Sequence, residues 1–355
     1  MMCALLAGSV ALSAHAKELD QFTDRVQVRQ YYAGGYQHIA NAPGPAQVDA
    51  VLDARMNQLL DKLLERLREA MPRTAAERDE LVRATFQHPL LPELVTPYEE
   101  WVKHEAPVPL YKVRDKGMFG QAVDYDDMRM TWYIELSPIV QVAGVLIGID
   151  KLGHFLAQGY QYYVHYRSLN ASEPLAARLL AVRAYGHGQE VGQLGIATGG
   201  VYSFADLASN WAGMEFHLAL FEAIDLQTGP HARYFERAAD GMYRRVRDFH
   251  WAEWITPDWD EVLNPAGVVE PALYTKLKAN FARHPRPGGV RRASICDQFR
   301  ANPQAYLGAH SALRPRSSYA LARAGSLVAP YAIDVQQLCG TDRNAPDPAR
   351  PHGPH

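Results

Sequence analysis

The chain has 355 residues, 48% of them hydrophobic, and a formal net charge of −3 at pH 7. That length is sufficient for one large hydrophobic core or two smaller ones. The near-neutral charge, with both signs mixed along the chain, argues against a nucleic-acid partner, because nucleic-acid binding generally requires a basic surface.

Residues 1–16 predict an export signal. The stretch MMCALLAGSVALSAHA is a short apolar segment ending in Ala14-His15-Ala16, which is typical of a signal-peptide cleavage site. We therefore expect a periplasmic protein. The later apolar run from Ile139 to Ile149 is shorter than the ~20 residues that a membrane span needs. We expect no transmembrane segment after signal cleavage and at most peripheral membrane contact.

Residues 17–290 predict a mainly α-helical domain, a multi-helix bundle. Its first helix covers Ala46 to Met71, where apolar residues recur every three or four positions and Pro72 ends the pattern. A second helix follows Thr74, a residue type that caps helix N-termini. The stretches LYKV and MTWYIEL are the only strand candidates and predict a small β-hairpin near residues 110–136.

Three central helices are predicted next, with helix caps and glycine stops between them. The first runs from about Pro138 through Asp150 to Arg167, with Gly148 as a candidate break. The second runs from a cap at Ser172 to Thr198-Gly199-Gly200, and the third from a cap at Ser203 to the stop at Thr228-Gly229-Pro230. Residues 232–249 and 270–284 predict two further helices.

The C-terminal part predicts one disulfide and a disordered tail. After signal removal two cysteines remain, Cys296 and Cys339, and an even number in an exported protein indicates pairing within residues 291–343. Such a bond would close a loop of about 40 residues and stabilise the fold by about 3–4 kcal/mol. The Pro-rich residues 344–355 predict disorder.

Polar side chains recur about one turn apart on the three central helices, among Ala, Leu, Ile and Gly. Residues three or four apart share one face of a helix. The pairs are Asp150 and His154 on the first helix, Glu190 and Gln193 on the second, and Asp206 and Asn210 on the third. Lys151 points about 100° away from Asp150, so we expect no direct pairing between the two.

Glycines lie within the predicted helices, where each costs about 0.5–1 kcal/mol relative to alanine. That cost indicates helices that approach closely, which would bring Asp150, His154, Glu190, Asp206 and Asn210 into one pocket. Buried carboxylates there must be paired, hydrogen-bonded or bound to a cation. The glycines are Gly153, Gly159, Gly186, Gly188, Gly192, Gly195 and Gly213.

The motifs DKLGHF, EVGQ and SFADLASNWAG, in this order, resemble the signature of the VanZ-like superfamily. They are also similar to a related family of small bacterial envelope lipoproteins. The similar core spans about residues 138–225, and the resemblance implies a cell-envelope function. VanZ-like proteins are embedded in membranes, whereas these helices are more polar. The positions that match are Asp150, Lys151, His154, Glu190, Gln193, Asp206, Asn210 and Gly213.

The first functional hypothesis is an exported envelope hydrolase. His154 would act as the general acid/base, Asp150 would orient it, and Glu190 would be a second acid/base. Asp206 and Asn210 would complete the catalytic group.

Two chemistries for this hydrolase stay open. In the first, a divalent metal held by His154, Glu190 and Asp206 activates water; in the second, the groups work as a metal-free acid/base pair. Lys151 would attract an anionic group of the substrate, and Gln193 would also bind the substrate. The resemblance alone implies the substrate class, an envelope component such as a lipid-linked or peptidoglycan intermediate.

The second hypothesis is a non-catalytic periplasmic scaffold or binding protein whose polar network fixes helix packing. Ser203 and Asp206 also match a capping box, in which the acid only satisfies backbone N–H groups. The stretch HWAEWITPDWDE places three tryptophans near acids, which leaves open a carbohydrate-binding face.

Overall fold

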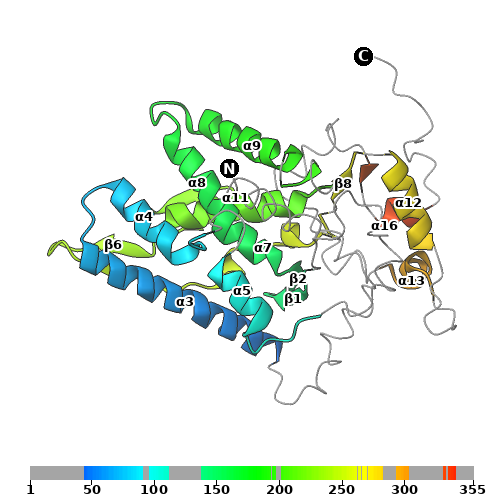
Figure 1. Cartoon of the computed structure of the whole chain (residues 1–355), viewed down its shortest axis with the longest axis horizontal. Helices are drawn as coiled ribbons and strands as arrows, with labels where there is room; N and C mark the ends of the chain where they lie inside the picture. Colours follow the sequence, from blue (N-terminus) through cyan, green and yellow to red (C-terminus); the bar gives the residue numbers. More distant parts are fainter. Residues whose placement is uncertain are drawn as a thin grey trace, which may run out of the picture.

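The computed structural model describes residues 44–90, 96–111, 137–192, 194–196, 201–261, 263–264, 266–269, 271–282, 293–303, 331–332 and 335–340. The predicted signal peptide, nearly all of the predicted hairpin at 110–136 and the predicted disordered tail lie outside these residues. Within them the chain is mainly α-helical, which confirms the predicted class (Figure 1).

Short hairpins and 3-10 turns lie between some of the helices. The helices are α3 Pro45–Ala70, α4 Ala75–Phe86, α5 Pro97–His104, α7 Asp150–Gly153, α8 Gly159–Ser168, α9 Leu175–Val191, α11 Phe204–Ala219, α12 Pro271–Ala282, α13 Ile295–Ala301 and α16 Val335–Cys339. A π-helical turn, His154–Gln158, links α7 to α8, and 3-10 turns cover Trp251–Glu253 and Pro257–Trp259. None of the helices in the described part is long and apolar enough to span a membrane.

The described strands are short and form small antiparallel sheets, paired as β1–β2, β3–β8–β9, β4–β5 and β6–β7. Their bounds are β1 Ile139–Val142, β2 Val145–Gly148, β3 Val201–Tyr202, β4 Ile224–Leu226, β5 Gly229–His231, β6 Phe235–Arg237, β7 Tyr243–Arg245, β8 Gly267–Val268 and β9 Tyr331–Ala332.

The first two predicted helices are confirmed as α3 and α4. The side chain of Thr74 accepts a hydrogen bond from the backbone N–H of Glu77 (3.2 Å), and the Glu77 carboxylate binds the Thr74 N–H in return. This capping box starts α4 immediately after the chain has turned at Pro72. The third central helix is also confirmed, because Ser203 caps α11 through the N–H of Asp206.

Most of the apolar run from Ile139 to Ile149 forms the β1–β2 hairpin, so the predicted helix was wrong before Gly148. From Asp150 onward the chain is helical to Ser168, close to the predicted end at Arg167. Ala143 and Gly144 connect the strands with φ angles of 51° and 79°, as in the tight turns that match strand twist. Almost every residue of both strands is buried. A short run that is apolar on both faces has no periodicity to separate strand from helix.

Two other boundaries also differ from the prediction. Residues 232–249 contain the β6–β7 hairpin instead of a helix; Asp240-Gly241 lies in its turn, and Gly241 has a φ of 82°. An Asp-Gly pair is a strong hairpin signal that the helical interpretation passed over. Helix α9 starts at Leu175, with no side-chain cap from Ser172, and ends at Val191.

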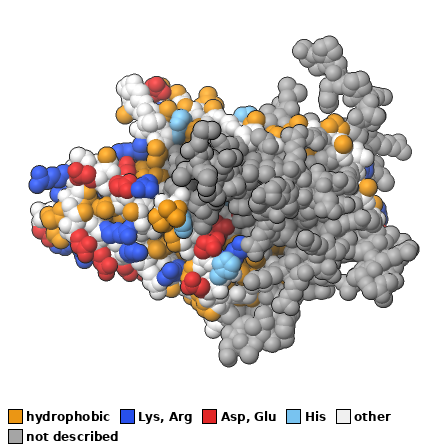
Figure 2. All heavy atoms as spheres, in the orientation of Figure 1, with side chains coloured by type: hydrophobic (Ala, Val, Ile, Leu, Met, Phe, Trp, Pro, Cys, Tyr) orange, Lys and Arg blue, Asp and Glu red, His pale blue; other side chains and the backbone are white. Residues whose placement is uncertain are grey.

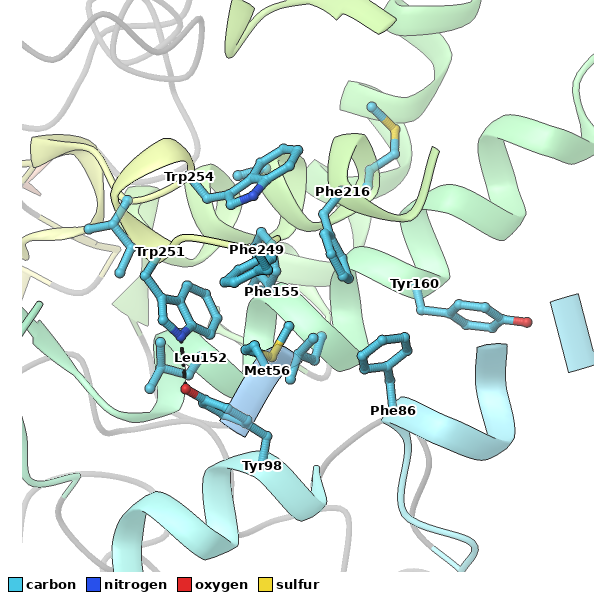
Figure 3. Close-up of a cluster of buried hydrophobic side chains, with 14 of the residues drawn as sticks. Met56, Phe86, Tyr98, Leu152, Phe155, Tyr160, Phe216, Phe249, Trp251 and Trp254 are labelled. Atoms are coloured by element: carbon cyan, nitrogen blue, oxygen red, sulfur yellow. Dashed lines mark hydrogen bonds between the residues drawn. The ribbon is translucent and has the colours of Figure 1, made fainter. Parts of the chain in front are cut away.

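The core is rich in aromatic side chains centred on Phe155 (Figure 3). The Phe155 ring lies 5.1 Å from the ring of Trp251 and 5.6 Å from that of Trp259. The indole of Trp251 donates a hydrogen bond to the hydroxyl of Tyr98 (2.8 Å). Trp251, Trp254 and Trp259 are at most 1% exposed, so the idea of a carbohydrate-binding face at these residues was wrong.

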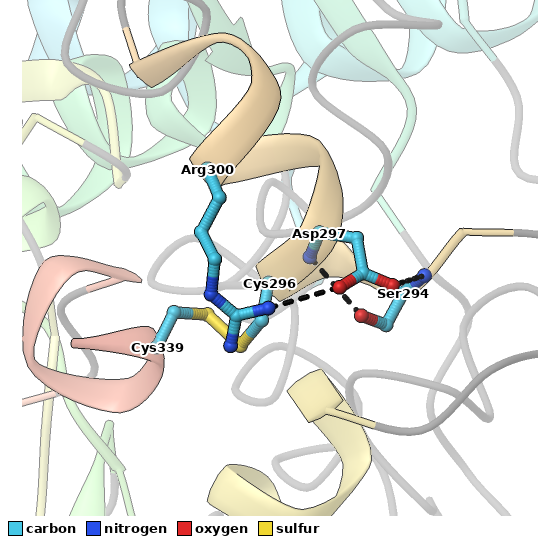
Figure 4. Close-up of a disulfide and its surroundings, with 5 residues drawn as sticks. All are labelled: Ser294, Cys296, Asp297, Arg300 and Cys339. Atoms are coloured by element: carbon cyan, nitrogen blue, oxygen red, sulfur yellow. Dashed lines mark hydrogen bonds and ion pairs between the residues drawn. A yellow bond between two sulfur atoms is a disulfide. The ribbon is translucent and has the colours of Figure 1, made fainter. Parts of the chain in front are cut away.

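The predicted disulfide is confirmed between Cys296 in α13 and Cys339 at the end of α16 (Figure 4). It links two helices whose cysteines are 43 residues apart in the sequence. Ser294 caps α13 by accepting the N–H of Asp297 (3.1 Å). The bond therefore ties together two short helices that are far apart in the sequence.

Candidate functional site

The candidate site lies where the helix formed by α7, the π-helical turn and α8 crosses α11. Glycines set the crossing distance: a Cβ on Gly159 would lie 2.5 Å from the Cα of Gly213. A Cβ on Gly213 would overlap the carbonyl oxygen of Phe155. The predicted close approach is confirmed at these two positions, whereas Gly188 has open space around it.

The π-helical turn His154–Gln158 begins at the predicted general base. Its carbonyl at Leu156 accepts a hydrogen bond from the Nε2–H of His217 in α11 (3.1 Å). Single π-turns inside α-helices are rare and frequently occur at functional sites. The sequence pattern did not signal this turn, and the bond from His217 joins residues 61 positions apart.

Both nitrogens of His154 face side chains of α11. Its Nδ1 lies 3.0 Å from the amide oxygen of Asn210, and its Nε2 lies 3.2 Å from Oδ2 of Asp206. With the amide in this orientation its oxygen can only accept, so Nδ1 carries a proton. Nε2, the other ring nitrogen, lies on the side of the Asp206 carboxylate. The predicted i, i+4 pairs on the two helices thus meet.

Lys151 is fully buried among carboxylates. Its ammonium lies 3.0 Å from Oδ2 of Asp150 and 2.9 Å from Oε1 of Glu261, and it also pairs with Asp206. The expectation that Lys151 could not reach Asp150 was wrong, because the flexible four-carbon side chain folds back although the two Cβ atoms diverge. Lys151 is engaged by three carboxylates, so it is not free to bind an anionic substrate group as predicted.

Glu261 belongs to this group although the sequence analysis did not select it. Its Oε1 accepts a hydrogen bond from the hydroxyl of Ser203 (2.8 Å), and the same hydroxyl accepts the N–H of Asp206 (3.0 Å). The cap at Ser203 is therefore real, but the Asp206 carboxylate faces Lys151 and His154 instead of the backbone. The signal for Glu261 was weak: an acid in a Trp-rich stretch without helical periodicity.

Glu190 lies at the edge of the group, at the end of α9. Its Oε1 accepts the backbone N–H of Ser203 (2.7 Å), whereas its buried Oε2 has no hydrogen-bond partner in the described part of the chain. Burial, reinforced by the negative charge of Asp206, raises the pKa of Glu190 well above its usual range. Both effects favour the protonated form of Glu190.

The pKa values of two other buried acids, Glu261 and Asp206, are shifted in opposite directions. Burial raises the pKa of Glu261 to about 8, although Lys151 opposes the shift. Burial also acts against the charged form of Asp206, but the positive charges of His154 and Lys151 outweigh it and hold the pKa of Asp206 below its usual value. The shifts therefore favour an ionised Asp206 and the protonated forms of Glu190 and Glu261.

Asp150, His154 and Asp206 form a candidate metal centre. Each offers one ligand atom, these atoms lie within 4.8 Å of one another, and all three residues are buried. Glu190 was predicted as a ligand, but in the described residues Asp150 takes its place in this group. Asn210 contacts the histidine, and Gln193 lies outside the described residues.

Comparisons of the chain with known protein families, with curated proteins and with solved structures give no match. The resemblance to the VanZ-like superfamily therefore stays a prediction based on the three motifs.

The buried His217 predicts an acid-sensitive fold. Burial lowers the pKa of His217 to about 4, from 6.5. Between these two pH values the unfolded chain binds the proton and the folded chain does not, so stability is complete above pH 6.5 and falls as the pH drops toward 4. The loss from this one group is about 3 kcal/mol.

Urea unfolding at pH 7, 5.5 and 4 measures this loss. The variant His217→Gln should lose that much less stability on acidification than the wild type. His104→Gln, which removes an exposed histidine, should keep the wild-type pH dependence. An equal loss in His217→Gln and wild type would contradict the assignment.

Proposed function

We propose that the chain is a metal-dependent hydrolase whose metal ligands are Asp150, His154 and Asp206. The observation that carries the proposal is the convergence of their three buried ligand atoms within 4.8 Å. One imidazole and two carboxylates suit a first-row divalent metal such as zinc or manganese. Asn210 supports this, because it holds Nδ1 of His154 and leaves Nε2 for the cation, as outer partners of metal-binding histidines do.

The charge balance of the group favours a cation. Four buried acids, Asp150, Glu190, Asp206 and Glu261, lie with a single buried ammonium, that of Lys151. Protonation of Glu190 and Glu261 removes part of the excess negative charge. Asp150 and Asp206 would remain negative beside the one ammonium, and a cation held between these two carboxylates would compensate them, as buried carboxylates require.

Each residue then has a defined role. When bound, the divalent cation polarises a substrate oxygen and lowers the pKa of a water molecule. Burial favours the protonated form of Glu190, and the Ser203 N–H fixes its Oε1, so Glu190 would serve as the general acid for the leaving group. Lys151 orients Asp150 and Asp206 and limits their mutual repulsion.

A metal titration tests the proposal. The purified chain, freed of metal by chelation, should bind one equivalent of zinc or manganese in isothermal titration calorimetry. Asp206→Asn should weaken binding by more than the about 10–100-fold that loss of an outer partner costs, and Asn210→Ala by an amount in that range. Asp79→Asn makes the same chemical change at a carboxylate that contacts Tyr163, so it should bind like wild type. Absence of binding by the wild type would refute the metal centre.

The scaffold hypothesis keeps one observation in its favour. The ammonium of Lys151 is fully buried and engaged by three carboxylates, as in a self-satisfied structural network. Glu190→Gln distinguishes the hydrolase from the scaffold, because the amide keeps the size of the protonated carboxyl group but cannot act as an acid. In the hydrolase this variant folds and binds metal but loses its proton donor. A scaffold shows no metal binding in any variant.

The cellular location, the bundle arrangement and the substrate class are proposed from the sequence alone. From the N-terminal segment and the motif resemblance, we also propose that the protein is exported to the periplasm, that its helices form a bundle with a VanZ-like core, and that its substrate is an envelope component. Fractionation of cells that produce the full chain tests the first of these points. Recovery of the protein in the cytoplasm would contradict it.

A further inference from the structure

A cavity of about 300 Å³ lies at the junction of α3 and α4, where the β6–β7 hairpin packs against it. Figure 1 shows β6 beside α3 and α4, at the end of the molecule away from α12 and α16. Phe221, which follows α11, also lines the cavity. Asp206 and Phe221 lie near opposite ends of α11, about 20 Å apart along the helix axis. The cavity is therefore separate from the candidate metal centre.

The cavity is strongly basic. Arg73, Arg78, Arg233 and Arg237 line it together with one acid, Glu236, so positive charges exceed negative ones by three. Charged side chains of both signs cover this end of the molecule in Figure 2, so the excess is a property of the cavity and not of the whole surface. Four guanidinium groups repel one another, and an occupant with several negative charges would relieve the repulsion.

The acids nearby are largely occupied elsewhere. Arg233 pairs with Glu236 (3.2 Å). Glu77 uses its carboxylate to accept the backbone N–H groups of Arg73 and Thr74. In the described part of the chain no acidic side chain pairs with Arg73 or with Arg237. Their charges are thus available to a ligand.

Arg78 is held in a suitable position for recognising an anion. Its guanidinium stacks over the ring of Phe221, 4.2 Å from the ring centre, and its side chain is 19% exposed. Its buried Nε has no hydrogen-bond partner in the described residues, and Asp79 approaches it only to 4.0 Å. Stacking fixes the plane of a guanidinium and leaves its edge free for paired hydrogen bonds to an oxyanion.

We propose that this cavity binds a phosphate-class polyanion, such as a pyrophosphate or a small phosphorylated molecule. Arg73, Arg78 and Arg237 would contact the phosphate oxygens, and the positive end of α4, which begins at Ala75 in the cavity wall, would add to the attraction. Tyr243 lines the same cavity and offers an aromatic surface to an unsaturated or apolar part of the ligand. The assignment does not depend on the proposed hydrolase.

Isothermal titration calorimetry of the full chain with inorganic pyrophosphate, in a phosphate-free buffer of low ionic strength, tests the proposal. The wild type should bind one equivalent, and Arg78→Gln should weaken binding at least 10-fold. Arg237→Gln should weaken pyrophosphate binding to a similar extent. This second variant keeps the test valid if Arg78→Gln fails to fold. Arg244→Gln removes the same charge from an exposed position of β7 outside the cavity and should change the affinity less than threefold.

Three outcomes would overturn the assignment. They are no binding by the wild type, equal weakening in Arg244→Gln and Arg78→Gln, and tighter binding of citrate than of pyrophosphate. Absence of binding would show that the cavity is no anion site. Equal weakening in both variants would show general charge attraction, and tighter citrate binding would show a preference for carboxylates.

Discussion

Lys151→Met is expected to lower the free energy of unfolding by about 3–5 kcal/mol, the usual cost of removing one partner from a buried ion pair. Methionine fills nearly the same volume but supplies no charge. Asp150, Asp206 and Glu261 would lose the only ammonium that contacts them in the described structure. Urea unfolding at pH 7 measures the loss.

The unfolding experiment on Lys151→Met includes a matched control variant and a measurement with added metal. Lys62→Met makes the same substitution at an exposed position of α3 and should change stability by less than about 0.5 kcal/mol. Because a divalent cation would compensate the same carboxylates, zinc should raise the stability of Lys151→Met more than that of the wild type. Equal stabilities of Lys151→Met and Lys62→Met would show that the buried charges are compensated in another way.

Gly213→Ala is expected to cost at least about 3 kcal/mol, at the upper end of what overpacking a core produces. The added Cβ would meet the carbonyl of Phe155 and would lie 2.9 Å from the Cα of Gly159. Both neighbours are backbone, so no side-chain rotation can relieve the overlap. The two helices would have to separate.

Gly188→Ala is the control for this prediction. Gly188 is exposed within α9 and a Cβ there meets nothing within 4 Å, so alanine should stabilise the helix by about 0.5–1 kcal/mol. Thermal unfolding of both variants gives the comparison. Gly213→Ala should also weaken metal binding, since Phe155 adjoins His154 and Asn210 precedes Gly213 by three residues. A fully stable Gly213→Ala would show that the crossing does not require glycine.

The pairs that carry the proposed site were accessible from the sequence because helical spacing is a local property. Asp150 with His154, and Asp206 with Asn210, had to share a helix face once their segments were helical. The cap at Ser203 was equally readable, since a cap involves only a few neighbouring residues. That the two faces meet was an inference from glycines, and Gly159 and Gly213 confirm it.

The identity of the ligands was not accessible in the same way. Glu190 and Asp150 were both reasonable partners for His154, and only the packing of α7 against α11 selects Asp150 for the metal group. The depth of burial decides whether a carboxyl group keeps its proton, and no local pattern gives that depth. The shifted pKa of Glu261 illustrates this, because the residue lies 58 positions after Ser203, to which it is bonded.

The sequence by itself determined the elements whose causes are local: the amphipathic helix α3 and the capped helices α4 and α11. The pairing of Cys296 with Cys339 was predicted from the number of cysteines and not from local structure. Tertiary structure alone decided the β1–β2 hairpin, the π-helical turn and the burial of Lys151. Short-range hydrogen bonds and periodicity act over a few residues, so they can be read from neighbours in the chain. Contacts between distant segments depend on how whole helices pack, and that packing sets which polar groups are buried together.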